Sequence, residues 1–192
     1  MPQLKIAVVI STTRPGRLGA SLTNWLAAIA KQRSDAAFEI VDLRDYPLPF
    51  FEEEIPPAFK PSGHAVAQRW SAKMAEFDAY IFVTAEYNHS LSGVLKNALD
   101  YLSSELKRKP AAFLGYGAVG GARAVEHLRH ILAELHVATI KPSVHIGRAE
   151  MLGLLREGKT MADFPYLADL VPPMLDDLLW WAGALRTARS AS

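Results

Sequence analysis

The chain alternates between short, continuous apolar runs and longer stretches in which apolar residues recur every three or four positions. Residues 6–10, Ile-Ala-Val-Val-Ile, form the first run, and an uninterrupted run of this kind is typical of a strand buried on both faces. The next apolar positions, Leu22, Trp25, Leu26 and Ile29, follow helical spacing. The pattern therefore predicts a buried strand that leads through a polar turn into an amphipathic helix.

The same alternation continues to the end of the chain. Short apolar runs predict further strands at residues 38–41, 79–83, 111–114 and 137–140, the last extended by residues 143–146. Helical spacing predicts inward helix faces at Val66/Trp70/Met74/Phe77, Leu91/Val94/Leu95/Ala98/Leu99/Leu102, Val125/Leu128/Leu132/Leu135 and Leu175/Leu178/Leu179/Ala182/Leu185. Strands that alternate with helices predict a doubly wound, three-layer α/β domain with a five-stranded parallel sheet. For this sheet we expect the flavodoxin-like strand order 2-1-3-4-5, one of the two common orders of doubly wound sheets.

Two segments fall outside this alternation. Residues 44–62 are rich in proline, which excludes a helix or a central strand and predicts a long loop. Within it, Tyr46, Phe50 and Phe51 either fix the loop to its own domain or contact a partner. Residues 147–160 show no clear periodicity, and we expect a surface excursion there.

A polar turn joins the first strand to the first helix, and it offers hydroxyl, guanidinium and glycine groups: Ser11, Thr12, Thr13, Arg14, Arg17 and Gly19. A strand that feeds a helix in this way directs the helix N-terminus beyond the strand tip, where it favours an anion. The alternative is a turn whose polar residues only cap the helix and whose arginines are solvated. No Lys-Ser or Lys-Thr pair follows the last glycine, so the turn is not a Walker loop.

A second polar loop follows the third strand and contains Glu86, Tyr87, Asn88, His89 and Ser90. Either Ser90 or the later Ser92 is suited to cap the next helix. In the order 2-1-3-4-5, the order in which successive strands are added to the sheet reverses between the first and third strands, and ligands bind at such a switch point. We therefore expect the first and second polar loops to share one crevice.

A glycine-rich stretch, Gly115-Tyr116-Gly117-Ala118-Val119-Gly120, follows the fourth strand and matches the pattern GxGxxG. It is a poor dinucleotide fingerprint, because no acidic residue ends a strand about twenty positions later and too little chain remains for a Rossmann domain. A loop whose backbone approaches a ligand is the better interpretation of Gly115 and Gly117.

Composition narrows the class of protein. Of the 192 residues half are apolar, the net charge is +1 and no cysteine is present. These values predict one domain over residues 1–192 and no nucleic-acid partner, and they exclude disulfides and cysteine nucleophiles. The first strand begins almost at once and no apolar run is long enough for a bilayer, which favours a cytoplasmic protein that binds no membrane. Residues 186–192 are expected to form a frayed tail.

Two of these loops resemble the motifs of a known family, the NAD(P)H-dependent FMN reductases with a flavodoxin-like fold. Glu86-Tyr87-Asn88, Ser90 and residues 93–100 are similar to its motif EYN-x-S-x-x-G-x-LKNA-x-D, which is specific. Residues 13–17, Thr-Arg-Pro-Gly-Arg, resemble its phosphate loop, and Leu48-Pro49 its proline-rich segment. The similarity covers roughly residues 5–144.

The resemblance implies bound FMN, with NADPH or NADH as the hydride donor and a small-molecule acceptor such as a quinone, a free flavin, an azo compound or a metal oxyanion. It implies FMN contacts from Thr12, Arg14 and Arg17, from the loop of Glu86, Tyr87 and Asn88, and from residues 115–117. Ser90 either contacts the phosphate region or caps its helix. No acid-base side chain is expected to be essential, because the cofactor supplies the chemistry.

The sequence departs from the family pattern at several positions. Ser11 stands where glycine is usual, Thr12 where serine is frequent, and Ala85 and Ser92 where prolines are common. His89 occupies the place of a smaller residue, and either faces the substrate or is an exposed loop residue. Arg17 has two possible targets, the flavin phosphate and the 2′-phosphate of NADPH.

The resemblance also implies a homodimer or homotetramer with the flavin near the interface. Trp180 and Trp181 lie partly off the apolar stripe of the last helix, and either complete the core or meet a second subunit. Two alternatives to a reductase remain: a flavodoxin-like electron carrier and a flavin-binding regulatory protein without catalysis. Carriers of this type are usually strongly acidic, whereas this chain is close to neutral.

Overall fold

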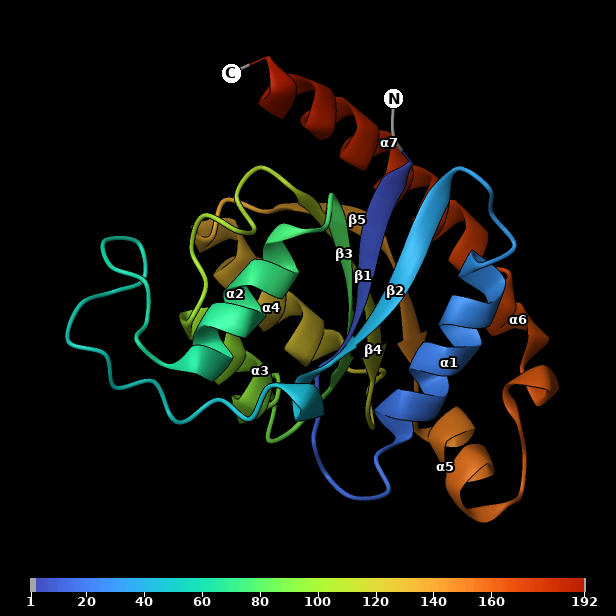
Figure 1. Cartoon of the computed structure of the whole chain (residues 1–192). Coiled ribbons are helices and arrows are strands. Elements are labelled where there is room, and N and C mark those ends of the chain that lie inside the picture. The colour runs from blue at the N-terminus through green and yellow to red at the C-terminus, as the bar shows by residue number, and fades with distance from the viewer. Residues whose placement is uncertain (1–2, 192) are drawn as a thin grey trace.

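Five parallel strands form one sheet in the order β2-β1-β3-β4-β5 in the computed structural model, which describes residues 3–191 (Figure 1). The strands are β1 (Leu4–Ile10), β2 (Ala36–Asp42), β3 (Ala79–Ala85), β4 (Pro110–Tyr116) and β5 (Ala138–Ile146). The predicted fold class and strand order are confirmed. The two apolar runs at the end of the sheet are one strand, with a register shift opposite residues 111–113. Pro142 lies in this part of the edge strand and has no N–H for the ladder.

Helices cover both faces of the sheet (Figure 1). One face is covered by α1 (Leu18–Ala30), α7 (Val171–Ser190) and the short α6 (Pro165–Ala168), and the other by α2 (Ala65–Ala75), α3 (Gly93–Asp100) and α4 (Ala122–Glu134). The helix α5 (Arg148–Arg156) lies near the start of α1 in Figure 1. Two 3₁₀ turns, η1 (Leu43–Asp45) and η2 (Met161–Asp163), complete the regular structure of the described residues.

The apolar core divides into two layers because successive side chains of a strand point to opposite faces. On β1, Ala7 and Val9 pack with α2, α3 and α4, whereas Ile6 and Val8 pack with α1 and α7. All of these strand residues are fully buried. The continuous apolar runs of the sequence therefore reflect a sheet covered on both sides.

The predicted helix faces are confirmed for most positions. Leu22, Leu95, Leu128 and Leu178 are completely buried. Val94 is an exception, because 40% of it is exposed.

The segment from residue 147 to 160 is not the featureless excursion that we expected, since it contains α5. Within α5 only Gly153 is fully buried, while Met151 and Leu154 pack at the edge of the core. Half-buried apolar positions on a short helix leave a weak pattern in the sequence, which explains the error.

The expected frayed tail is also wrong for residues 186–190, because α7 continues through Ser190. Arg186 and Arg189 reach the carboxylate of Asp78, at 3.5 and 3.1 Å. These contacts fix the end of α7 to the turn before β3. Ser192 lies outside the described residues.

The proline-rich loop after η1 is confirmed and extends away from the body of the molecule (Figure 1). Tyr46 packs against Trp70 and Phe51 against Tyr101, each with 5.1 Å between ring centroids. These two aromatic residues therefore fix the loop to its own domain. Phe50 points outward and is 87% exposed. None of the helices in residues 3–191 is long and apolar enough to span a membrane.

Candidate functional site

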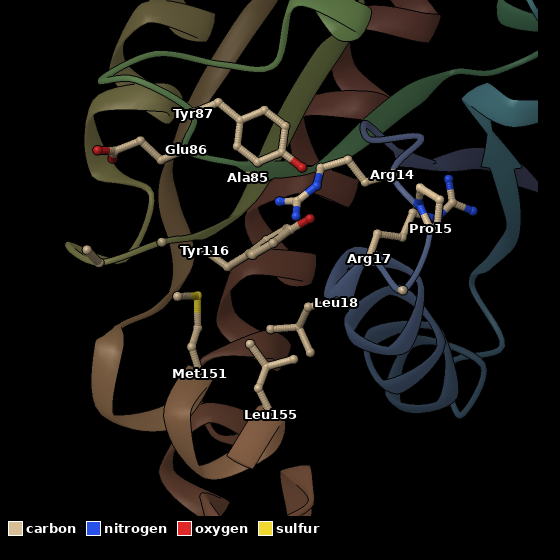
Figure 2. A pocket seen from close by; sticks show the side chains of 13 residues that line it. Arg14, Pro15, Arg17, Leu18, Ala85, Glu86, Tyr87, Tyr116, Met151 and Leu155 are labelled. Carbon is tan, nitrogen blue, oxygen red and sulfur yellow. The ribbon is translucent and has the colours of Figure 1, made fainter.

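A cavity of about 420 Å³ opens at the carboxyl ends of β1, β3 and β4 (Figure 2). We call it the crevice. Its lining residues come from the three polar or glycine-rich loops and from α5: Arg14, Pro15, Gly16, Arg17, Leu18, Ala85, Glu86, Tyr87, Tyr116, Gly117, Ala118, Met151 and Leu155. The expectation that the first two polar loops share one crevice is confirmed. Its volume is in the range of small-molecule and cofactor sites.

The candidate residues named from the sequence divide into two groups. Arg14, Arg17, Glu86, Tyr87, Tyr116 and Gly117 line the crevice. The others do not line it. Ser11 and Thr12 are buried at the start of the polar turn, and Thr13 lines a neighbouring cavity of about 320 Å³ on the side of η1 and α3.

Arg17 is held by Asp42, the last residue of β2. Two guanidinium nitrogens contact the two carboxylate oxygens, and a further bond goes to the carbonyl of Thr12. The Arg17 side chain is only 5% exposed. Its positive charge is therefore paired within the protein, which makes Arg17 a weak candidate for contact with a ligand phosphate.

Asp42 stays ionised because of the same contacts. Burial opposes its ionisation, but hydrogen bonds from the Arg17 guanidinium and from the backbone N–H of Arg44 hold its pKa below the ordinary value. The Arg44 N–H donates to Asp42 Oδ1 at 2.9 Å. The ion pair at the end of β2 is thus a fixed part of the turn.

Arg14 differs from Arg17 because it is exposed and extends across the mouth of the crevice (Figure 2). Its guanidinium carbon lies 5.8 Å from the centroid of the Tyr87 ring, within the range of a cation–π contact. Figure 2 shows Arg14 directed toward both Tyr87 and Tyr116. Arg14 is therefore the arginine of this turn that is placed to meet a ligand.

The second polar loop is a tight turn. The backbone groups of Tyr87 and Ser90 exchange hydrogen bonds of 2.9 and 3.1 Å. Asn88 and His89 between them have φ of 48° and 74°, the left-handed values of a two-residue type I′ turn. Asn88 and His89 thus form the tip of the turn and do not line the crevice.

The structure also decides between the two candidate caps of α3. The backbone N–H of Leu95 donates to Ser92 Oγ at 3.2 Å, so Ser92 is the cap. The Oγ atom of Ser90 instead lies 2.9 Å from Nδ1 of His127. Ser92 is not among the residues proposed for the site from the sequence, although its place before the helix is a recognisable signal.

Although Glu86 is among the residues that line the crevice, its carboxylate points away from the cavity (Figure 2). Only 5% of its side chain is exposed, and Oε1 accepts a 2.6 Å hydrogen bond from Nε of Arg123. Its backbone N–H donates to the carbonyl of Tyr116 at 3.0 Å. Glu86 therefore joins the second loop to β4 and α4.

The glycine-rich stretch brings backbone segments of the protein close together. A Cβ atom on Gly115 would lie 2.8 Å from the carbonyl oxygen of Gly120, and one on Gly117 would lie 3.0 Å from Cβ of Glu86. We expected these glycines to admit a ligand. For Gly115 the close neighbour is instead the protein's own backbone, while Gly117 also lines the crevice.

Tyr116 forms one wall of the crevice and is buried apart from 6% of its surface. Its hydroxyl oxygen is 3.4 Å from Oγ1 of Thr12, and burial raises its pKa. The ring therefore stays neutral at physiological pH.

Sequence reasoning missed the apolar floor of the crevice, formed by Leu18, Met151 and Leu155 (Figure 2). Met151 and Leu155 are four residues apart on α5, and this spacing was the available signal. No group of three or more His, Cys, Asp or Glu side chains within residues 3–191 is arranged to hold a metal ion.

A known protein family matches the part of the chain that contains the three loops of the crevice. The family model described as NADPH-dependent FMN reductase matches residues 4–150, which includes all three loops. The chain belongs to this family. Helix α7 and most of α5 lie beyond the matched range.

Individual relatives agree with the family assignment. An NAD(P)H-dependent FMN reductase of Nectria sp is 35% identical over 145 residues, 72% of each chain. A 2-hydroxy-1,4-benzoquinone reductase of Burkholderia sp is 36% identical over 155 residues, 77% of this chain and 80% of the relative. The solved structure of FerB, a flavoenzyme NAD(P)H:(acceptor) oxidoreductase of Paracoccus denitrificans, shares the fold, with a TM-score of 0.71 and 23% identity over 94% of this chain and 98% of that one.

Proposed function

We propose that this chain is a reductase that binds FMN in the crevice and passes electrons from NADPH or NADH to a small acceptor. Quinones, free flavins, azo compounds and metal oxyanions are the acceptor classes considered, and the relatives favour a quinone. The observation that carries the proposal is the convergence of three loops on one cavity inside the range that the family model matches.

The residues of the crevice fit FMN in both charge and shape. The exposed guanidinium of Arg14 stands beside the start of α1, which has neither a side-chain cap nor an acidic residue in its first turn. Such a helix end favours a phosphate group. In the same cavity, Tyr87, Tyr116 and the backbone of Gly117 offer flat surfaces to an aromatic ring.

Bound FMN would supply the redox chemistry, accepting a hydride from the nicotinamide and delivering the electrons to the acceptor. The role of the protein is to bind the FMN and to orient its ring. We assign the phosphate to Arg14 and the first turn of α1, and the ring to the walls formed by Tyr87 and Tyr116. Met151 and Leu155 shield the floor from water. No side chain is assigned as an acid or a base.

Two experiments test the proposal. Purified protein is titrated with FMN, and binding is followed by quenching of flavin fluorescence. NADPH and NADH oxidation is then measured with FMN and a quinone, and steady turnover is expected. FMN binding without turnover would favour an electron carrier or a regulatory protein. Absence of FMN binding would overturn the assignment.

We propose further that the chain acts as a homodimer or homotetramer in the cytoplasm, where nicotinamide nucleotides are supplied. Large exposed side chains support an assembly, since Phe50 is 87%, Phe59 83% and Trp180 66% exposed. A shallow groove between α3 and α4, lined by Leu91 and Ile131 among others, adds apolar surface. Sedimentation analysis would show a single monomeric species if this proposal is wrong.

A further inference from the structure

In the polar turn between β1 and α1, the four consecutive carbonyl groups of residues 11–14 each accept a hydrogen bond from a side chain. We call the donors, Ser92, Arg17 and Arg44, the carbonyl clamp. The bonds run from Ser92 Oγ to Ser11 O (2.6 Å), from Arg17 to Thr12 O, from Arg44 Nε to Thr13 O (3.1 Å) and from Arg44 Nη2 to Arg14 O (2.5 Å).

The donors of the carbonyl clamp are themselves anchored. Asp42 pairs with Arg17, with 2.8 Å from Oδ1 to Nη1, and accepts the backbone N–H of Arg44. Ser92 is fixed as the cap of α3. The shape of the turn is therefore imposed by the end of β2 and by the starts of α1 and α3. The planar guanidinium fork of Arg44 is what allows one side chain to hold two successive carbonyls.

The carbonyl clamp affects which side of the turn carries negative partial charge. Arg44 lies in the neighbouring cavity, on the far side of the turn from the crevice. In a trans peptide the carbonyl and the following N–H point in opposite directions. The Thr12 carbonyl held by Arg17 and the Thr13 carbonyl held by Arg44 therefore leave the following N–H groups, of Thr13 and Arg14, on the opposite side of the turn. The Arg14 carbonyl is followed by Pro15, which has no N–H. Among residues 3–191, the N–H groups of Thr13 and Arg14 have no hydrogen-bond acceptor.

We propose that the carbonyl clamp, anchored by Asp42, determines the preference of the crevice for a phosphate-bearing flavin over riboflavin. The proposal rests on the function proposed above. Arg17 and Arg44 act through the backbone as positioning residues, whereas Arg14 is the cation that meets the phosphate. If the turn relaxes, carbonyl oxygens approach the phosphate and repel it, while the binding surface for the ring is unchanged.

The first test uses Arg44→Lys, which keeps the charge but cannot hold two carbonyls. Dissociation constants for FMN and riboflavin are measured by fluorescence titration. FMN affinity is expected to fall about tenfold, the loss typical of one charged hydrogen bond, with riboflavin affinity unchanged. Arg69→Lys is the control, because Arg69 is an exposed arginine on α2 and the same charge-conserving substitution there leaves the carbonyl clamp unaltered.

The second test uses Asp42→Asn, for which two explanations predict opposite signs. If charge alone governs binding, removal of a carboxylate near the phosphate tightens FMN binding. If the carbonyl clamp governs it, Arg17 and Arg44 lose their anchor and FMN binds more weakly. Unchanged or tighter FMN binding would overturn the proposal.

An equal loss of FMN and riboflavin affinity in Arg44→Lys and Asp42→Asn would also overturn the role of the carbonyl clamp, while leaving the reductase assignment intact. A wild-type chain that binds neither flavin would overturn the assignment and the clamp together.

Discussion

The hydroxyl of Tyr116 lies against Gly19 so closely that a Cβ atom on Gly19 would come within 2.7 Å of it. Tyr116 ends β4 and forms a wall of the crevice, while Gly19 is in the first turn of α1. Glycine at position 19 therefore determines how closely Tyr116, which forms a wall of the crevice, approaches the start of α1, to which we assign the phosphate.

This contact predicts a specific rescue. Gly19→Ala is expected to lower the free energy of unfolding by about 1–3 kcal/mol, because the Tyr116 ring must shift within a packed site. In a Tyr116→Phe background the same change should cost much less, since the clashing oxygen is gone. Gly183→Ala is the control, because nothing lies within 4 Å of its added Cβ atom on α7. Additive effects in chemical denaturation of the double mutant would contradict the explanation.

Arg14→Ala is expected to weaken FMN binding by about 1.5–3 kcal/mol, the contribution of a hydrogen bond to a charged group. Its guanidinium is exposed and extends toward Tyr87, so the stability of the protein should hardly change. Calorimetric titration measures the change in affinity. An unchanged dissociation constant would remove Arg14 from the site.

Leu155→Ser tests the apolar floor of the crevice. Leu155 is 58% exposed, so the change should leave thermal stability intact while it removes about 1 kcal/mol of apolar contact with a bound ring. The binding of FMN and the binding of riboflavin should be weakened equally, because both molecules carry the ring. A selective loss of FMN would show that α5 acts on the phosphate end instead.

Ser92→Ala and Ser90→Ala form a matched pair. Ser92 Oγ makes two buried hydrogen bonds, to the Ser11 carbonyl and from the Leu95 N–H, so its loss should destabilise the protein by about 1–3 kcal/mol. Ser90 makes an exposed contact with His127, and its loss should cost less than about 0.5 kcal/mol. Equal melting temperatures of the two variants would contradict the assignment of the cap.

Lys109 predicts a dependence of stability on pH. It is 8% exposed, and its Nζ donates to the Ala75 carbonyl and the Tyr80 hydroxyl at 3.0 and 3.2 Å. Burial, with a contribution from Arg189, lowers its pKa to about 8. Above pH 8 the folded chain therefore holds fewer protons at this site than the unfolded chain, and stability rises with pH.

The test compares the free energy of unfolding of the wild type with that of Lys109→Met, measured by urea unfolding between about pH 8 and pH 10. Across this window the wild type should gain stability relative to the variant by up to about 1.4 kcal/mol per pH unit. Tyr80 has a raised pKa and is present in both proteins, so its titration largely cancels. A difference that stays constant with pH would show that Lys109 titrates at the same pH in both states.

The strands and the meeting of the two polar loops were predictable from the sequence because both depend on local pattern. A parallel sheet covered on both faces requires continuous apolar runs such as residues 6–10. The partners of charged side chains were not predictable. Arg17 and Asp42 are 25 positions apart, and Arg189 and Asp78 are 111 apart. In sequence, each of these residues is indistinguishable from a solvated charge.

The hydrogen bonds at Ser11, Thr12, Thr13 and Arg14 have a consequence for protein engineering. Two of the three donors lie outside the Ser-Thr-Thr-Arg-Pro-Gly-Arg heptapeptide, on η1 and before α3. Transplanting the heptapeptide into another scaffold would therefore transfer its sequence but not its conformation. The recipient would also need the aspartate that ends the second strand, the arginine two residues later and the serine that caps the third helix.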